Sequence, residues 1–238
     1  MARQEKPAVG VLMLAGRMAD VPGCMASDAS FAHPVHRKVV SGSSTPRRPA
    51  DIPPMLPNYL DAARELRDDG VDVITANCGL LALAQQQVAD AVDVPVVLSS
   101  LIAVPTVARM IGPHRRVGIL TFFVDAVGEE NFTACGWSSS EAPVSVAGVG
   151  RYRSWNRFLE TKEMDGELRA RLRDDLLEVI TEFLARESDI GALVSECTML
   201  PAVLSELRPL IPVPVFDILT VIDWAVSGSR HSVVGDAH

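Results

Sequence analysis

Short apolar runs alternate with amphipathic stretches along almost the whole chain, and this alternation limits the possible folds more than any other feature. The runs are short and rich in β-branched side chains, which is typical of buried strands. They are apolar on both faces, as expected for parallel strands covered by helices. The predicted strands are Val9–Leu14, Val71–Ala76, Pro95–Leu98, Val117–Thr121, Val144–Val149, Gly191–Ser195 and Val213–Phe216.

The stretches between these runs have the period of amphipathic helices. In Gly166–Arg186, six leucine, valine, isoleucine and phenylalanine side chains fall on one stripe, while the arginines point elsewhere. Met199–Leu210 and Leu80–Val92 are shorter examples. Strands that alternate with helices predict an α/β fold, with a doubly wound, flavodoxin-like parallel sheet and right-handed crossovers.

The chain also repeats itself. Val9–Leu12 is echoed by Val117–Leu120, an offset of 108 residues, and Cys78 is matched by Cys197, an offset of 119. Val94-Pro95-Val96 and Val213-Pro214-Val215 show the offset of 119 again. We therefore predict two pseudo-symmetric α/β halves, residues 1–112 and 113–238, with the active site between them and a C-terminal segment able to cross back to the first half.

One proline-rich segment interrupts the pattern. Seven of the sixteen prolines lie between Pro22 and Pro57. A long irregular stretch within a compact domain is usually functional or mobile. We interpret it as a loop over a cleft, with a disordered insertion as the alternative.

Composition excludes several classes of protein. The 238 residues are 48% hydrophobic, enough for a large core, and the formal charge of -8 offers no basic footprint for nucleic acid. No apolar run is long enough for a membrane span. The polar segment Met1–Val9 has no export signal, and four cysteines are too few for a disulfide scaffold, so we expect a cytoplasmic protein.

Two cysteines stand where chemistry is expected. Ligands of open α/β sheets bind beyond the carboxyl ends of the strands. Cys78 and Cys197 both follow a predicted strand and precede a predicted helix, whose N-terminus stabilises a thiolate and attracts a carboxylate. We expect the two to face each other across one cleft, and we assign Cys24 and Cys135 to structural packing.

The segments around these cysteines, Ile74–Gly79 and Val194–Thr198, with Val213–Asp217 following, resemble the aspartate/glutamate/hydantoin racemase superfamily. The resemblance covers Val9 to about Trp224, apart from the loop between Gly16 and Pro57. It implies cofactor-independent racemisation between two α/β halves, with one cysteine on each face of the substrate Cα. It also implies a homodimer.

The chain departs from glutamate-racemase-like members at three places. Asn77 precedes Cys78 and Gly79 follows it, Met199 stands in place of a histidine, and the loop after the first strand has Gly16 in a different motif. These departures point to an uncharacterised branch of the superfamily and away from free glutamate as the substrate. Branches of this fold also include arylmalonate decarboxylases and maleate isomerases.

Physical chemistry supports a pair of thiols. Inverting a carbon acid requires a base on one face and an acid on the other, and a thiolate and a thiol exchange these roles when the reaction reverses. We expect each thiol to have a pKa lowered from about 8.5 by a helix N-terminus. The role of Glu196 stays open. The candidate substrate-binding residues, which would hold a carboxylate, are Gly16, Asn77, Gly79, Thr121 and Thr198.

No cofactor is expected. None of the three lysines, Lys6, Lys38 and Lys162, follows a predicted strand, so a pyridoxal Schiff base has no donor. The pair His33 and His36 lacks the further ligands of a metal site. The first strand is not followed by a GxGxxG turn, and there is no phosphate-binding GxxxxGK[ST] motif.

We therefore predict an isomerase of amino acid metabolism: a racemase or epimerase of an amino acid or its derivative, with Cys78 and Cys197 as the two bases. One alternative is a lyase or a cis–trans isomerase with one essential cysteine. The other is a non-catalytic protein that binds a small acid. The expected partner is a small carboxylate, with neither nucleic acid nor membrane involved.

Overall fold

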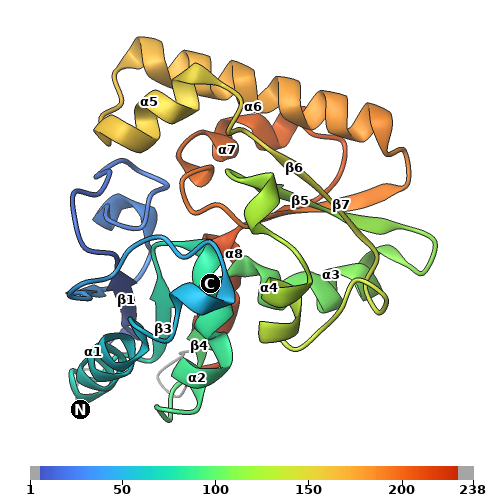
Figure 1. The fold of residues 1–238 in the computed structure, drawn as a ribbon. Coiled ribbons are helices and arrows are strands. Elements are labelled where there is room, and N and C mark those ends of the chain that lie inside the picture. The colour runs from blue at the N-terminus through green and yellow to red at the C-terminus, as the bar shows by residue number, and fades with distance from the viewer. Residues whose placement is uncertain (1–5, 230–238) are drawn as a thin grey trace, which may run out of the picture.

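The computed structural model describes residues 6–229 and contains two parallel four-stranded sheets (Figure 1). The first sheet has the order β2-β1-β3-β4 and the second the order β6-β5-β7-β8, so the two halves repeat one topology. The strands are β1 (Val9–Met13), β2 (Val35–Val39), β3 (Val73–Ala76), β4 (Val96–Val97), β5 (Arg116–Thr121), β6 (Val144–Gly148), β7 (Ile190–Ser195) and β8 (Val215–Phe216). The predicted α/β fold with two pseudo-symmetric halves is confirmed.

Eight α-helices among these residues cover the sheets. They are α1 (Leu56–Asp68), α2 (Gln85–Ala89), α3 (Val104–Ile111), α4 (Glu129–Ala134), α5 (Arg153–Thr161), α6 (Gly166–Arg186), α7 (Pro201–Leu207) and α8 (Ile218–Ser227). α6 has the predicted bounds, because Asp165 caps it and its apolar stripe is buried. No helix in residues 6–229 is long and apolar enough to cross a membrane.

The two halves share one core. Val9 and Val73 of the first sheet belong to the same buried cluster as Ile119 and Val194 of the second. The last described helix, α8, packs on β3 and β4, so it crosses back to the first half. This shared core fixes the carboxyl ends of the two sheets relative to each other.

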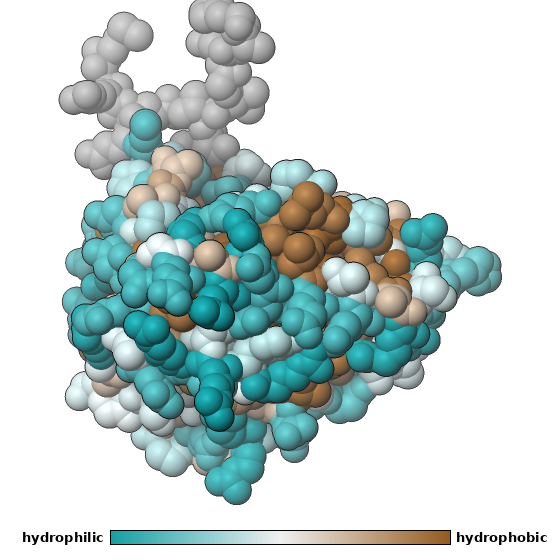
Figure 2. All heavy atoms as spheres, turned by 90° about the horizontal axis from the view of Figure 1, so that it is seen from above, coloured by the Kyte–Doolittle hydropathy of each residue, from teal (hydrophilic) through white to brown (hydrophobic). Residues whose placement is uncertain are grey.

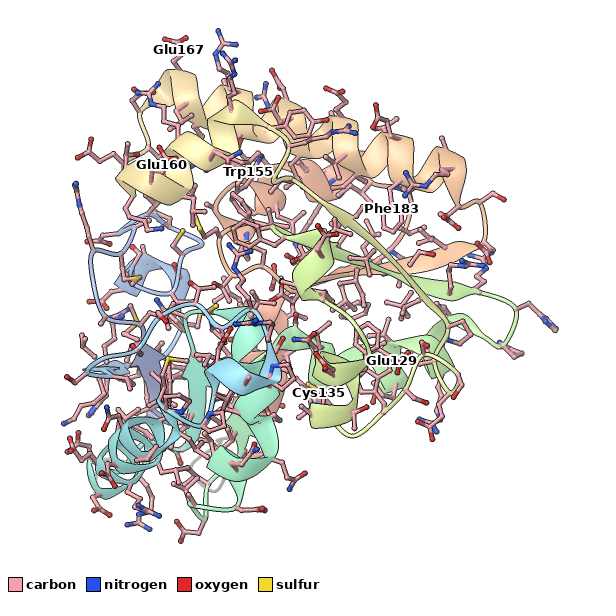
Figure 3. The ribbon with its side chains drawn as sticks, viewed as in Figure 1. Glu129, Cys135, Trp155, Glu160, Glu167 and Phe183 are labelled. Carbon is pink, nitrogen blue, oxygen red and sulfur yellow. The ribbon has the colours of Figure 1, made fainter. Side chains whose placement is uncertain are left out.

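The outer layer of the second half shows the expected division between apolar and polar faces. Trp155 of α5 and Phe183 of α6 are fully buried in a cluster with the second sheet (Figure 3). The face seen from above these helices is largely hydrophilic, with one group of hydrophobic residues (Figure 2). The charged side chains of α6, such as Arg171 and Glu167, pair with one another at the surface.

The proline-rich segment, predicted as an irregular loop, contains a strand and two 3-10 turns, Asp28–Ser30 and Pro49–Asp51. It contains β2, which pairs in parallel with β1 at the edge of the first sheet. The sequence of β2, VHRKV, lacks an apolar run because an edge strand is only half-covered, and its side chains are exposed or partly exposed. His36 therefore lies in a strand rather than in a loop.

Candidate functional site

The loops that follow β3 and β7 occupy corresponding positions in the two halves. The backbone N–H of Asn77 donates to the carbonyl of Leu12, and that of Glu196 donates to the carbonyl of Leu120. The residue after each is a cysteine, Cys78 or Cys197. The two loops are joined directly, since the hydroxyl of Thr198 donates a 2.6 Å hydrogen bond to the carbonyl of Asn77.

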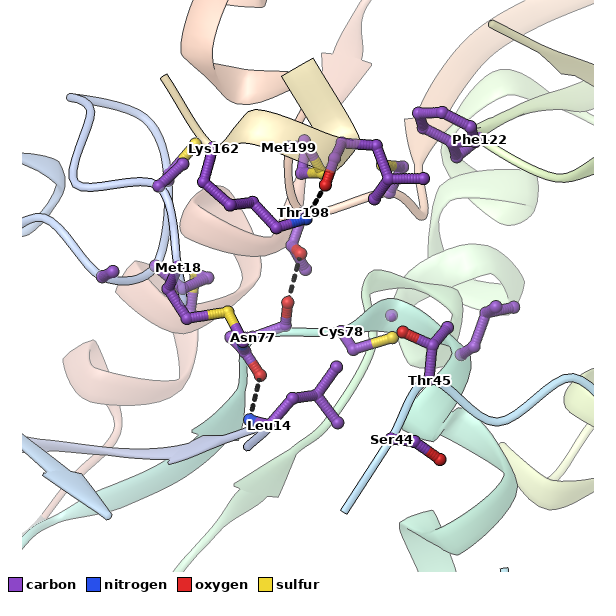
Figure 4. Close-up of a pocket in the computed structure, with 18 of the residues that line it drawn as sticks. Leu14, Met18, Ser44, Thr45, Asn77, Cys78, Phe122, Lys162, Thr198 and Met199 are labelled. Carbon is purple, nitrogen blue, oxygen red and sulfur yellow. Dashed lines mark hydrogen bonds between the residues drawn. The ribbon is translucent and has the colours of Figure 1, made fainter. Parts of the chain in front are cut away.

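Both cysteines line one cavity of about 340 Å³ at this junction, which we call the thiol cavity (Figure 4). The lining residues that were not predicted as site residues include Cys24 from the proline-rich segment and Lys162 from the end of α5. Figure 4 shows Cys78 turned toward Thr45, with Lys162 reaching in from the opposite side. All four cysteines are free thiols, and Cys135 lies at the end of α4, outside the residues that line this cavity (Figure 3).

The predicted carboxylate-binding residues mostly line the same cavity but are largely occupied by the protein itself. The side-chain oxygen of Asn77 accepts from the backbone N–H of Leu14 at 2.8 Å, and Thr121 donates to Glu196 at 2.6 Å. Gly79 packs against Glu196 so closely that a Cβ would lie 2.1 Å from its carbonyl oxygen. Gly16 is not among the residues that line the cavity, although its neighbours Ala15 and Arg17 are.

The electrostatic state of the thiols differs from the expectation. Burial and, to a smaller extent, the negative charge of Glu196 raise the pKa of Cys78 to about 12. The N–H groups of Leu80 and Leu81 and the hydroxyl of Thr45 act in the opposite direction but are outweighed. The pKa of Cys197 is raised even more, by the same two causes. The prediction of an α-helix directly after each cysteine is wrong, since a 3-10 helix, Gly79–Ala84, follows Cys78 and α7 begins only at Pro201. The N–H groups that follow the cysteines do not make these thiols acidic, because burial costs the thiolate more than those groups return.

Glu196 is the acidic group of this site. Its side chain is buried, and burial raises its pKa to about 7, with the hydrogen bond from Thr121 opposing the shift. It is the only Asp or Glu among the residues that line the cavity. A carboxyl group with this pKa ionises near neutral pH, and its negative charge raises the pKa of both thiols.

Lys162 is the corresponding cation. It ends α5 in the left-handed conformation, with φ 58°, and its ammonium group donates to the carbonyl of Leu159. Burial lowers its pKa, while the negative charges that Cys197, Cys24 and Cys78 would carry as thiolates oppose the shift. Sequence reasoning missed this residue because it follows a helix rather than a strand. The one available signal was that lysines are rare in the chain.

No metal site accompanies these groups. No cluster of three or more histidine, cysteine or acidic side chains suited to a metal occurs within residues 6–229. The cavity instead offers the thiols of Cys78 and Cys197 at the strand ends, with Cys24 as a third, the cations Lys162 and Arg17, and one carboxyl group, and Arg17 is already paired with Glu163.

The fold is similar to that of several solved α/β enzymes. It superposes on unliganded arylmalonate decarboxylase with a TM-score of 0.61 at 18% identity, covering 97% of this chain and 94% of that one. A glutamate racemase from Bacillus anthracis gives a TM-score of 0.60 at 13% identity, over 94% of this chain and 81% of the other. At these identities the likeness concerns the fold. No family model matches the sequence.

Curated proteins with similar sequences are named as lyases rather than as racemases or decarboxylases. A dimethylsulfoniopropionate lyase of Durusdinium sp. clade D is 26% identical over 226 residues, which are 92% of this chain and 74% of that protein. Dimethylsulfoniopropionate lyase 5 of Emiliania huxleyi is 27% identical over 188 residues, 71% of this chain but only 36% of the larger protein.

Proposed function

We propose that this chain is a cofactor-independent lyase that removes a proton next to a carboxylate and expels a sulfonium group from the neighbouring carbon. The observation that carries the proposal is the convergence of Cys78, Cys197 and Lys162 on one cavity. The choice of a sulfonium carboxylate is supported by sequence similarity to dimethylsulfoniopropionate lyases over 92% of the chain.

The reaction uses one thiolate as a base. It takes a proton from the carbon beside the carboxylate, that C–H electron pair forms the double bond, and the C–S pair leaves with sulfur as neutral dimethyl sulfide. Acrylate remains, and the thiol later returns its proton to water. We assign the base to Cys78, because Thr45 and two backbone N–H groups stabilise its thiolate and its pKa is raised less than that of Cys197.

The charges of the cavity suit a zwitterion. Lys162 binds the carboxylate and stabilises the negative charge that develops on it when the proton leaves. Glu196 pairs with the cationic end. While Glu196 is ionised and unpaired it opposes thiolate formation at Cys78, and a cation beside it removes this opposition. The substrate thus brings the charge that activates the base.

The decisive experiment measures dimethyl sulfide and acrylate released from dimethylsulfoniopropionate by the reduced protein. We expect equal amounts of the two products, loss of activity in Cys78→Ser, and residual activity in Cys197→Ser. To test the racemase alternative, the same protein is incubated in deuterated water with amino acids, hydantoins and substituted malonates, and deuterium uptake is measured by mass spectrometry. Ligand binding without turnover of any substrate would indicate a binding protein and contradict the proposal.

A racemase or epimerase is the second candidate. It is favoured by the origin of the two thiols, which follow corresponding strands of the two halves and so suit the two faces of one carbon. In that case deuterium enters Cα with inversion, and Cys78→Ser and Cys197→Ser abolish inversion equally.

A further inference from the structure

A second cavity, of about 430 Å³, lies next to the candidate active site. It sits beyond the carboxyl ends of β5 and β6, and Phe122 and Phe123 form a wall that it shares with the thiol cavity. Neither the cysteines nor Lys162 are among its lining residues. We call it the arginine cavity, because Arg47, Arg151 and Arg186 line it.

The lining of the arginine cavity carries more basic than acidic side chains, although the chain as a whole is acidic. Its three guanidinium groups face two acidic residues, Asp125 and Glu182, whereas the whole chain has a formal charge of -8. Arg151 is paired with Glu178 and Glu182, and Arg186 with Glu187, so the guanidinium of Arg47 is the group best able to attract a small anion to this concave site. Guanidinium groups also match the oxygens of carboxylates and phosphates through paired N–H donors.

Each arginine is held in a different way. Arg151 is neutralised by Glu182, at 2.5 Å, and Arg186 contacts Glu187 at 3.5 Å. The guanidinium of Arg47 has no carboxylate within ion-pair distance among residues 6–229 and lies over the ring of Phe123, 3.4 Å from its centroid. The ring fixes this cation at the cavity while leaving its N–H groups free for a ligand.

We propose that the arginine cavity is a second binding site, for a small oxyanion such as a phosphate or a carboxylate, with Arg47 and Arg186 as its main ligands. The site is connected to the candidate chemistry through the chain itself. Arg47 is two residues from Thr45, whose hydroxyl faces the thiol of Cys78 (Figure 4) and acts to lower the pKa of that thiol. A bound anion therefore contacts the segment that stabilises the proposed catalytic thiolate.

The test is binding of inorganic phosphate, measured as the shift in thermal midpoint and by calorimetry at constant ionic strength with chloride as the replaced anion. A ligand that binds only the folded state raises the midpoint. We expect Arg47→Met and Arg186→Met each to weaken binding by roughly tenfold, and the double variant to abolish it. The matched control is Arg173→Met, on the same helix as Arg186 but outside the cavity.

Arg47 and Arg186 are both exposed, so their substitution should not prevent folding. Circular dichroism in the absence of phosphate verifies that the variants fold. An equal phosphate response in the double variant and the parent overturns the proposal, and so does an equal response to chloride. Acetate titrated in parallel distinguishes a carboxylate ligand from a phosphate.

A further variant separates this inference from the proposed lyase function. Lys162→Met should impair turnover and keep the phosphate response, because Lys162 does not line the arginine cavity. If Lys162→Met loses the phosphate response, the anion occupies the thiol cavity and the second site does not exist. Failure of the lyase assay leaves the phosphate titrations interpretable.

Discussion

Thr121 at the end of β5 donates a 2.6 Å hydrogen bond to the carboxyl group of Glu196 at the end of β7. This contact joins the carboxyl ends of two neighbouring strands and holds the acidic group of the thiol cavity in place. Burial, only partly opposed by this hydrogen bond, gives Glu196 a pKa of about 7. The carboxyl group of Glu196 therefore gains or loses its negative charge near neutral pH.

The first prediction concerns stability and pH. Because the pKa of Glu196 is about 7 when folded and 4.5 ordinarily, the folded chain holds this proton more tightly than the unfolded chain. The resulting stability is complete below about pH 4.5 and is lost as pH rises through 7. Relative to Glu196→Gln, the free energy of unfolding of the parent should fall by roughly 3 kcal/mol between these limits.

Denaturant unfolding at a series of pH values measures this difference. The matched control is Glu160→Gln, an exposed glutamate on α5, which is expected to follow the parent at every pH. A difference between parent and Glu196→Gln that does not change with pH would mean that Glu196 titrates normally in the folded protein.

The second prediction concerns the reactivity of Cys78. Only the thiolate is alkylated. The negative charge of Glu196 is, after burial, the second cause of the raised pKa of this thiol. Above neutral pH, Glu196→Gln should therefore accelerate alkylation of Cys78 by iodoacetamide roughly tenfold. Thr45→Ala should slow it, because the hydroxyl that stabilises the thiolate is lost.

Peptide mass spectrometry resolves Cys78 from the other thiols and gives both rates. Cys24 serves as an internal control, since burial raises its pKa without a contribution from Glu196. Slower alkylation of Cys78 in Glu196→Gln would argue that the carboxyl group relays protons instead of repelling the thiolate.

The third prediction concerns Lys162. If its ammonium group binds the carboxylate of the substrate, Lys162→Met should raise KM at least tenfold and lower kcat, because charge on the carboxylate grows in the transition state. Lys162→Arg keeps the charge and should recover part of both. Lyase kinetics with the three proteins decide this. An unchanged KM in Lys162→Met would remove this residue from the substrate site.

Much of the fold was predictable from apolar runs, and the exceptions have physical reasons. β5 and β7 are buried on both faces, so their sequences are continuous apolar runs. β2 lies at a sheet edge, where polar side chains are tolerated, and its sequence carries no such signal. The offset of 119 between Cys78 and Cys197 predicted the paired sheets, because corresponding loops follow corresponding strands.

The site was less accessible to sequence reasoning. Its strand-end residues could be proposed from the topology, and their roles remain predictions. Lys162 and Thr45 reach the cavity from a helix end and from a loop, positions that no periodicity marks. The pKa of the thiols was mispredicted because burial depends on side chains from distant segments, whereas helix N-termini are visible locally.

The last prediction concerns Gly79, the residue after Cys78. A Cβ at this position would lie 2.1 Å from the carbonyl oxygen of Glu196 and 2.5 Å from a carboxyl oxygen of the same residue. Such contacts force the two strand-end loops apart, so Gly79→Ala should cost about 3 kcal/mol of folding free energy. It should also displace Glu196 relative to Cys78 and disturb the thiol reactivity described above.

Gly166→Ala is the control for this substitution, because a Cβ at that position, in the first turn of α6, meets no atom within 4 Å. It should be neutral or slightly stabilising, since alanine favours a helix over glycine. Urea unfolding of both variants, together with the alkylation rate of Cys78, tests the comparison. If Gly79→Ala is as stable as the parent and its thiol reacts at the parent rate, the two loops are not packed as closely as the structure shows.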